Sequence, residues 1–129
     1  MKKLTMAEAA KPQTEAQLHA DVVKYLKQAL PANAVFHHSP NEGKRGWIAQ
    51  KSLKTYGTRA GWPDIEIIWG GRFYGIELKS KSGRVEDTQM SVMKDITSAG
   101  AAWIVCCSKE EVELALNGWG IPLKARIAA

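Results

Sequence analysis

Two acidic residues and one lysine lie on the arms of a predicted β-hairpin. Residues 64–69 and 72–79 have the alternating pattern of strands, and Gly70-Gly71 between them predicts a two-residue turn. In that register Asp64 stands opposite Glu77, and Lys79 shares their face because side chains alternate along a strand. We therefore expect these three side chains to form one polar cluster.

A cluster of this kind suits metal chemistry. Directly opposed side chains have Cβ atoms about 5 Å apart, so two carboxylates there must share a proton or a cation. A hard divalent ion such as Mg²⁺ binds carboxylate oxygens together with water and phosphate oxygens. Water on that ion can attack a phosphodiester, and Lys79 can orient the water or stabilise the developing charge. The pattern indicates metal-assisted phosphodiester hydrolysis.

Each half of the pattern also has an ordinary structural explanation. A Pro-Asp dipeptide is common in turns, and Glu-x-Lys is common on solvated strands. Together they are more informative, because the hairpin's other face is entirely apolar. That face carries Ile65, Ile67, Trp69, Tyr74, Ile76 and Leu78. A longer turn would shift the register and separate the carboxylates. Glu66 faces Gly75 in the expected register, which favours a structural role for this acid.

The remaining segments predict an α/β domain. A capping box at residues 14–17 begins a helix that Pro31 ends, and a second box at 108–111 begins a helix to about residue 116. Further expected elements are strands at 34–37 and 101–107, the latter buried on both faces, and helices at 47–56 and 86–98. Met90, Met93 and Ile96 should point inward from the last of these. The order predicts a central mixed β-sheet flanked by α-helices. Residues 14–129 would form this single domain after a flexible arm at 1–13.

Charge favours a polyanionic partner. The 129 residues include 18 Lys and Arg against 13 Asp and Glu, a net charge of +5. Residues 43–63 contain no acid, and aromatic rings are interleaved with their basic residues, although core packing is the favoured explanation of the rings alone. The basic residues expected to contact nucleic acid are Lys44, Arg45, Lys51, Lys54, Arg59, Lys81 and Arg84.

Other classes of protein fit less well. No apolar run approaches the roughly 20 residues that span a bilayer, so a membrane location is not expected. Cys106 and Cys107 are adjacent within an apolar segment, which is typical of small core residues in a reducing compartment. No Cys and His spacing resembles a zinc site.

Short motifs in this order resemble those of a known family. Gly61-Trp62-Pro63-Asp64 followed by Glu77-Leu78-Lys79 resembles the signature of the PD-(D/E)XK nucleases, and more narrowly that of a stand-alone VRR-NUC domain. The resemblance runs from residue 14 to residue 107. Its supporting pieces are Glu15, Asn41-Glu42-Gly43, Arg59 two residues before Gly61, and Gln89.

The resemblance implies a restriction-endonuclease-like core that depends on Mg²⁺ or Mn²⁺. It implies that Asp64 and Glu77 are metal ligands, joined by the main-chain carbonyl of Leu78, and that Lys79 is the catalytic lysine. Glu15 would be an additional acid that reaches the metal or its water. The helix dipole is the commoner reason for an acid at that position of a helix. Gln89 would be a further polar residue of the active site.

The resemblance also implies a partner and an assembly. Small stand-alone members are homodimers that cleave branched DNA, including Holliday junctions, in the cytoplasm of bacteria or phage-infected hosts. Candidate interface residues are Trp103, Trp119 and Ile121, with core packing the simpler explanation for Trp103.

Two alternatives to a DNA endonuclease follow from the same residues. The first is a non-catalytic nucleic-acid-binding module that retained the fold, which the intact Asp64, Glu77 and Lys79 argue against. The second is a hydrolase of small phosphate compounds. The extended basic segment at 44–62 disfavours it, because a small substrate needs no such surface.

Overall fold

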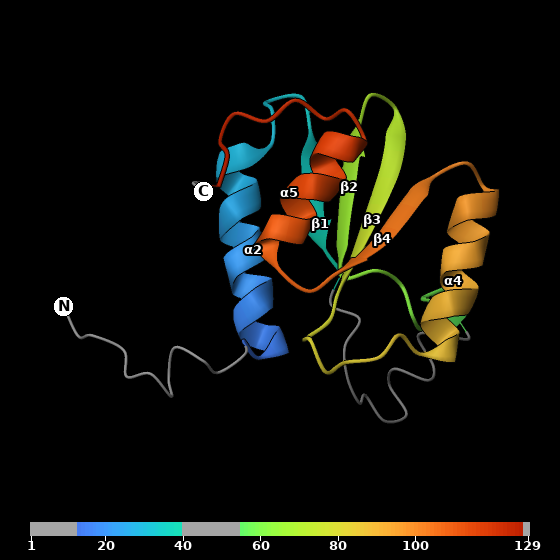
Figure 1. Cartoon of the computed structure of the whole chain (residues 1–129). Helices are drawn as coiled ribbons and strands as arrows, with labels where there is room; N and C mark the ends of the chain where they lie inside the picture. Colours follow the sequence, from blue (N-terminus) through green and yellow to red (C-terminus); the bar gives the residue numbers. More distant parts are fainter. Residues whose placement is uncertain (1–12, 40–54, 128–129) are drawn as a thin grey trace.

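The computed structural model describes residues 13–39 and 55–127, and within them it shows the expected α/β architecture (Figure 1). The elements in chain order are α2 (Glu15–Ala29), β1 (Val35–His38), β2 (Ile65–Trp69), β3 (Arg72–Leu78), α4 (Asp87–Ser98), β4 (Ala102–Cys106) and α5 (Lys109–Gly118). The helix predicted at 47–56 lies almost wholly outside the described residues. None of the described helices has the length and apolar character needed to cross a bilayer.

The sheet is mixed, as predicted, in the order β1-β2-β3-β4. Antiparallel pairing joins β1 to β2 and β2 to β3, and parallel pairing joins β3 to β4. The hairpin has the predicted register, with Ile65 opposite Ile76 and Trp69 opposite Arg72. Gly70 and Gly71 have φ angles of 60° and 76°, the left-handed conformations that a two-residue hairpin turn requires.

Helices α2 and α5 cover the apolar face of the sheet (Figure 1). The predicted hairpin face is buried except for Trp69, which is half-buried. Leu18, Val22 and Leu26 form the inward stripe of α2. The core that results comprises Leu18, Val22, Tyr25, Leu26, Ala29, Leu30, Ile65, Ile67, Tyr74, Ile76, Leu78, Cys106, Val112, Ala115, Leu116 and Ile121.

The helix starts confirm one capping box in full and the other in part. The Thr14 hydroxyl accepts a hydrogen bond from Gln17 N at 3.1 Å, and the Gln17 side chain accepts one from Thr14 N at 2.9 Å. At α5, the Ser108 hydroxyl accepts from Glu111 N at 3.1 Å. The Glu111 carboxylate, however, accepts from Cys107 N instead of from Ser108 N. The start of α5 is therefore as predicted, with the acid reaching one residue further back.

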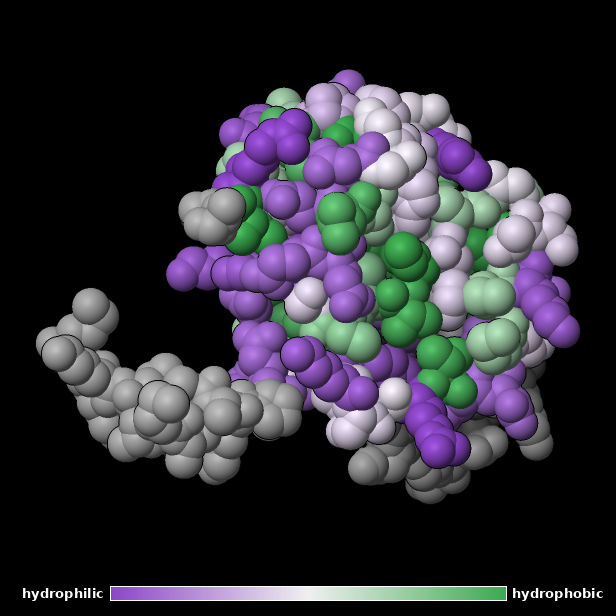
Figure 2. Space-filling model, viewed as in Figure 1, coloured by the Kyte–Doolittle hydropathy of each residue, from purple (hydrophilic) through white to green (hydrophobic). Residues whose placement is uncertain are grey.

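Three predictions about packing were wrong. Met90 was predicted to point inward, but it is 39% exposed. The buried residues of α4 are Val92 and Ile96, because the inward stripe of this helix passes through Val92 instead. Strand β4 is only half-buried over Ala102–Val105, since it lies at the edge of the sheet. Figure 2 shows hydrophobic residues reaching the surface mainly between α5 and α4. Ile121, a predicted interface residue, lies within the core with only 2% of its surface exposed, so it is not available for contact with a second subunit.

The loop that enters β2 is held tightly against the start of α4. Gly61 has a φ of 84°, and a Cβ at this position would lie 2.6 Å from the main-chain oxygen of Thr88. Gly57 has a similar φ of 80°, but a Cβ there would meet nothing within 4 Å. Only glycine at position 61 therefore allows the two backbones to approach, and this contact fixes the chain three residues before Asp64.

We predict that Gly61→Ala lowers the free energy of unfolding by about 2–4 kcal/mol. Gly57→Ala is a matched control, because it carries the same φ strain of roughly 1–2 kcal/mol without the clash. Urea unfolding of both variants measures the difference. Equal losses would show that the close approach to α4 contributes nothing.

Candidate active site

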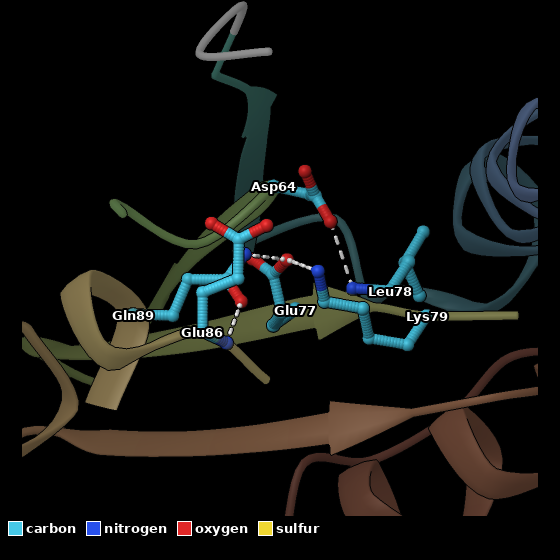
Figure 3. Close-up of polar contacts among 6 residues, drawn as sticks. All are labelled: Asp64, Glu77, Leu78, Lys79, Glu86 and Gln89. Carbon is cyan, nitrogen blue, oxygen red and sulfur yellow. Dashed lines mark hydrogen bonds and ion pairs between the residues drawn. The ribbon is translucent and has the colours of Figure 1, made fainter. Parts of the chain in front are cut away.

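Asp64 lies directly before β2 and is fixed on both sides by main-chain hydrogen bonds. Its Oδ2 accepts a hydrogen bond from Leu78 N at 2.8 Å (Figure 3). Its main-chain oxygen accepts one from Ser39 N at 2.8 Å. One more step of the β2–β3 register beyond Ile65 and Ile76 places Asp64 opposite Glu77. The structure therefore brings together the two carboxylates that the hairpin pattern predicted to face each other.

Glu77 is the one charged residue that is buried in the part of the chain that the structure describes, with 3% of its surface exposed. Its Oε2 accepts a hydrogen bond from Gln89 Nε2 at 2.6 Å and lies 3.7 Å from Lys79 Nζ (Figure 3). Its Oε1 is also buried and has no hydrogen-bond partner. One oxygen of this carboxylate is thus satisfied by the protein and the other is not.

This environment disfavours the charged form of Glu77. Burial raises the pKa of its carboxyl to about 8, and the negative charge of Asp64 adds to the effect. The ammonium of Lys79 lowers the pKa but does not offset these causes. The metal-free site therefore holds a proton on Glu77 at neutral pH.

Gln89 is oriented by the start of α4. Its Oε1 accepts a hydrogen bond from Glu86 N at 2.9 Å, so its amide NH₂ group must face Glu77 (Figure 3). Gln89 is the third residue after the N-cap Glu86, the position from which a Gln side chain reaches back to the cap. The sequence analysis placed Gln89 by resemblance alone. The Glu-x-x-Gln spacing at 86–89 was the signal that would have given its orientation.

Glu66 has a structural contact, in agreement with its expected role. Its Oε1 accepts a hydrogen bond from Trp62 Nε1 at 2.7 Å, and the Trp62 ring packs against Phe73 with centroids 5.9 Å apart. This contact anchors the Gly61-Trp62-Pro63 segment to the sheet.

A cleft of about 470 Å³ adjoins the carboxylates. It is lined by Glu15, Ala16, His19, Ala20, His38, Asp64 and Leu78. Glu15 is exposed in this cleft, and its charge also raises the pKa of Glu77. Glu15 is therefore an exposed acid that faces the same cleft as Asp64. The sequence analysis missed the two histidines, which come together only in the tertiary structure.

The donor set fits a hard divalent cation. Within residues 13–39 and 55–127, no three Asp, Glu, His or Cys side chains gather closely enough to hold a metal, so Glu15 does not complete a cluster with Asp64 and Glu77. Mg²⁺ needs only one or two protein carboxylates, because it keeps several waters. The buried Oε1 of Glu77 has no hydrogen-bond partner and Asp64 lies opposite, so these two residues are the ones that would hold such an ion.

The basic residues that were predicted to contact nucleic acid differ in their surroundings. Lys81 and Arg84 are exposed in the loop after β3. Arg59 forms an ion pair with Asp95 of α4 while keeping 43% of its side chain exposed. Lys44, Arg45, Lys51 and Lys54 lie outside the described residues. Of the basic residues predicted to contact nucleic acid, Lys81 and Arg84 are therefore the described ones that lie closest in sequence to Lys79. Both are exposed.

Comparisons with known proteins agree with this geometry. A solved structure, a VRR_NUC domain protein, matches with a TM-score of 0.66 over 83% of this chain and 88% of that one, at 21% identity. At that identity the likeness supports the fold alone. A search of the curated proteins found no match. Residues 3–110 match the family model of the VRR-NUC domain. Because that match spans most of the 129 residues, the chain belongs to the VRR-NUC family of nuclease domains.

Proposed function

We propose that this protein is a Mg²⁺- or Mn²⁺-dependent DNA endonuclease whose catalytic residues are Asp64, Glu77 and Lys79. The observation that carries the proposal is the buried carboxylate of Glu77, opposite Asp64, with one oxygen left without a partner. Ionising a carboxyl buried in this way is costly unless a ligand compensates its charge. Membership of a nuclease family supplies the class of reaction and DNA as the substrate.

Asp64, Glu77 and the main-chain carbonyl of Leu78 would hold the ion. When bound, the ion polarises the scissile phosphate and makes its water more acidic. Gln89 keeps Oε2 of Glu77 turned toward α4, which leaves Oε1 for the ligand side. The hydrogen bond from Leu78 N fixes Asp64 in the same way. Both carboxylates are therefore preorganised before any ligand arrives.

Lys79 supplies the positive charge of the site. Its Nζ lies 3.7 Å from Glu77 Oε2, a weak ion pair from which it can turn to the attacking water or to the phosphate oxygens. Its side chain is only 13% exposed, so its charge is poorly screened by solvent. Glu15, in the adjoining cleft, would accept a hydrogen bond from water bound to the ion.

We further propose that the substrate is branched DNA, such as a Holliday junction, and that the active form is a homodimer in the cytoplasm of a bacterium or a phage-infected host. The resemblance described above supports this proposal. A twofold axis relating two equal sites suits the cutting of two equivalent strands. Exposed Lys81 and Arg84, which follow Lys79, would contact the phosphate backbone.

We predict that Asp64→Asn, Glu77→Gln and Lys79→Ala each reduce cleavage by at least about 100-fold while DNA binding survives. The assay uses labelled four-way, flap, single-stranded and duplex DNA with Mn²⁺, with the cuts mapped. Glu110→Gln, an exposed acid on α5, is the control. Paired symmetric cuts in the four-way substrate support junction resolution. Full activity of any of the three variants, or of the wild type in EDTA, contradicts the proposed site.

The pKa of Glu77 predicts how the stability of the metal-free protein depends on pH. Glu77 titrates near 4.5 when unfolded and near 8 when folded, so the folded state binds more protons between these values. The contribution of Glu77 to stability therefore falls as pH rises from about 4.5 to about 8 and then levels off.

The substitution Glu77→Gln removes the loss of stability that the ionisation of Glu77 causes as pH rises. We predict that, without metal, the variant is more stable than the wild type by roughly 4–5 kcal/mol at pH 8.5 and by about 1 kcal/mol or less at pH 5. Thermal unfolding in EDTA measures both differences. Added Mg²⁺ should raise the Tm of the wild type and not that of the variant. A difference between the variant and the wild type that does not grow from pH 5 to pH 8.5 would disprove the assignment.

The proposed contacts between the loop after β3 and the DNA phosphate backbone lead to a separate prediction. Lys81→Ala and Arg84→Ala should each weaken DNA binding by the same factor for unrelated sequences and reduce the slope of log affinity against log salt by about 1. Lys27→Ala, an exposed lysine in the last turn of α2, is the control. An unchanged salt slope in both loop variants would remove this loop from the interface.

A further inference from the structure

Strand β4 forms one edge of the sheet and has no charged side chain. Its residues are Ala102-Trp103-Ile104-Val105-Cys106, and the first four are only half-buried. Figure 1 shows β4 between α5 and α4, and Figure 2 shows, from the same side, hydrophobic residues at the surface there. Natural edge strands are usually protected from pairing by Lys or Pro, and β4 contains neither. This edge is therefore suited to pairing with a further strand.

The main chain of β4 presents hydrogen-bonding groups on its outer side. Lys79 N donates a hydrogen bond to Cys106 O at 3.0 Å, so the main chain of Cys106 faces β3. Because successive residues of a strand alternate, Ile104 also faces β3, and the N–H and C=O groups of Trp103 and Val105 point outward. Within residues 13–39 and 55–127, no strand lies beyond β4 and no main-chain hydrogen bond of a loop or turn uses these groups.

The residues on either side of β4 already use their N–H groups. Ala101 N donates to Ile96 O at 3.1 Å, at the end of the connection from α4. Cys107 N donates to the Glu111 carboxylate at 2.8 Å, at the start of α5. In the described structure, the available donors on the outer side of this strand are thus Trp103 N and Val105 N, two residues apart.

We propose that β4 pairs antiparallel with β4 of a second copy of this chain, with Trp103 of each copy opposite Val105 of the other. Each opposed pair then exchanges both of its main-chain hydrogen bonds. A shift by two residues in either direction would oppose one of these residues to Ala101 or Cys107, whose N–H groups are already bonded. The edge is therefore complementary to itself, as a twofold dimer requires.

The side chains also favour a second copy as the occupant. Ile104 would oppose Ile104 of the other copy at the twofold axis, so apolar groups meet apolar groups. A DNA strand would find no cation on β4. The edge at β1 differs, because it carries His37 and His38.

The inference rests on the proposed function, in which the active form is a homodimer, and deepens it by naming the contact. The two copies would share one continuous sheet, with their β3 strands three strand spacings apart, or about 14 Å. Val105 pairs with Glu77 of β3 in the same chain. The interface would therefore lie one strand away from a catalytic carboxylate of each copy.

A disulfide trap tests the register. Opposed residues that are not hydrogen-bonded to each other have Cβ atoms about 4.5–5.5 Å apart, close enough for a disulfide after a small shift. In a Cys107→Ser background, Ile104→Cys should form a covalent dimer on oxidation. Val35→Cys, at the exposed edge β1, is the matched control and should not. A dimer trapped through Val35→Cys and not through Ile104→Cys would overturn the inference and leave the proposed homodimer standing.

A second pair of variants tests the hydrogen bonds. Val105→Pro removes an outward N–H and leaves the bonds between β4 and β3 in place. Its dimer dissociation constant in sedimentation should rise at least about 30-fold, since each copy loses one hydrogen bond and leaves one carbonyl unsatisfied. Val105→Ala loses side-chain atoms but keeps the N–H, and its constant should change far less. Equal constants for the two variants would overturn the inference.

Amide hydrogen exchange of the wild type covers variants that fail to fold. The protection of Trp103 N–H and Val105 N–H should rise with protein concentration, and that of Ile104 N–H, which faces β3, should change far less. Rapid exchange of both outward amides at every concentration would overturn the inference. A wild type that protects these amides and cleaves no DNA would instead refute the endonuclease function and leave the interface standing.

Discussion

The structure depends on keeping two carboxyl groups opposite each other, one of them buried away from water and the other at the wall of a cleft. Asp64 and Glu77 oppose each other at the end of the β2–β3 hairpin, and Glu77 is almost completely buried. The protein compensates for this only in part: Leu78 N donates to Oδ2 of Asp64, Gln89 and Lys79 both contact Oε2 of Glu77, and Oε1 of Glu77 has no hydrogen-bond partner. Under the proposed function, a divalent cation would complete this site.

Each surrounding element helps to hold Asp64 and Glu77 opposite each other. The Gly70-Gly71 turn sets the register that opposes the carboxylates. Helices α2 and α5 bury the apolar face of the same hairpin, so a slip of one residue would expose the core. On the other face, the start of α4 both receives the Gly61 loop and orients Gln89 toward Glu77. The site is therefore built where the hairpin and α4 meet.

The sequence predicted what depends on local rules. The turn, the strand alternation and the cap of α2 follow from neighbouring residues, and the first two are enough to predict that Asp64 and Glu77 oppose each other. Long-range packing could not be predicted in this way. Met90 proved exposed, Ile121 entered the core, and His19 met His38 because α2 lies beside the end of β1. The contact of Gln89 with Glu77 likewise depends on where α4 docks on the sheet.

The most direct test of the central claim is the number of protons released when Mn²⁺ binds, measured by titration calorimetry in buffers of different ionisation enthalpy. Because the pKa of Glu77 is about 8 in the metal-free site, binding at pH 7 should release about one proton, and binding at pH 9 almost none. Glu77→Gln should bind Mn²⁺ far more weakly and release no proton. Tight binding by the wild type without proton release, or equal binding by Glu77→Gln, would contradict the account.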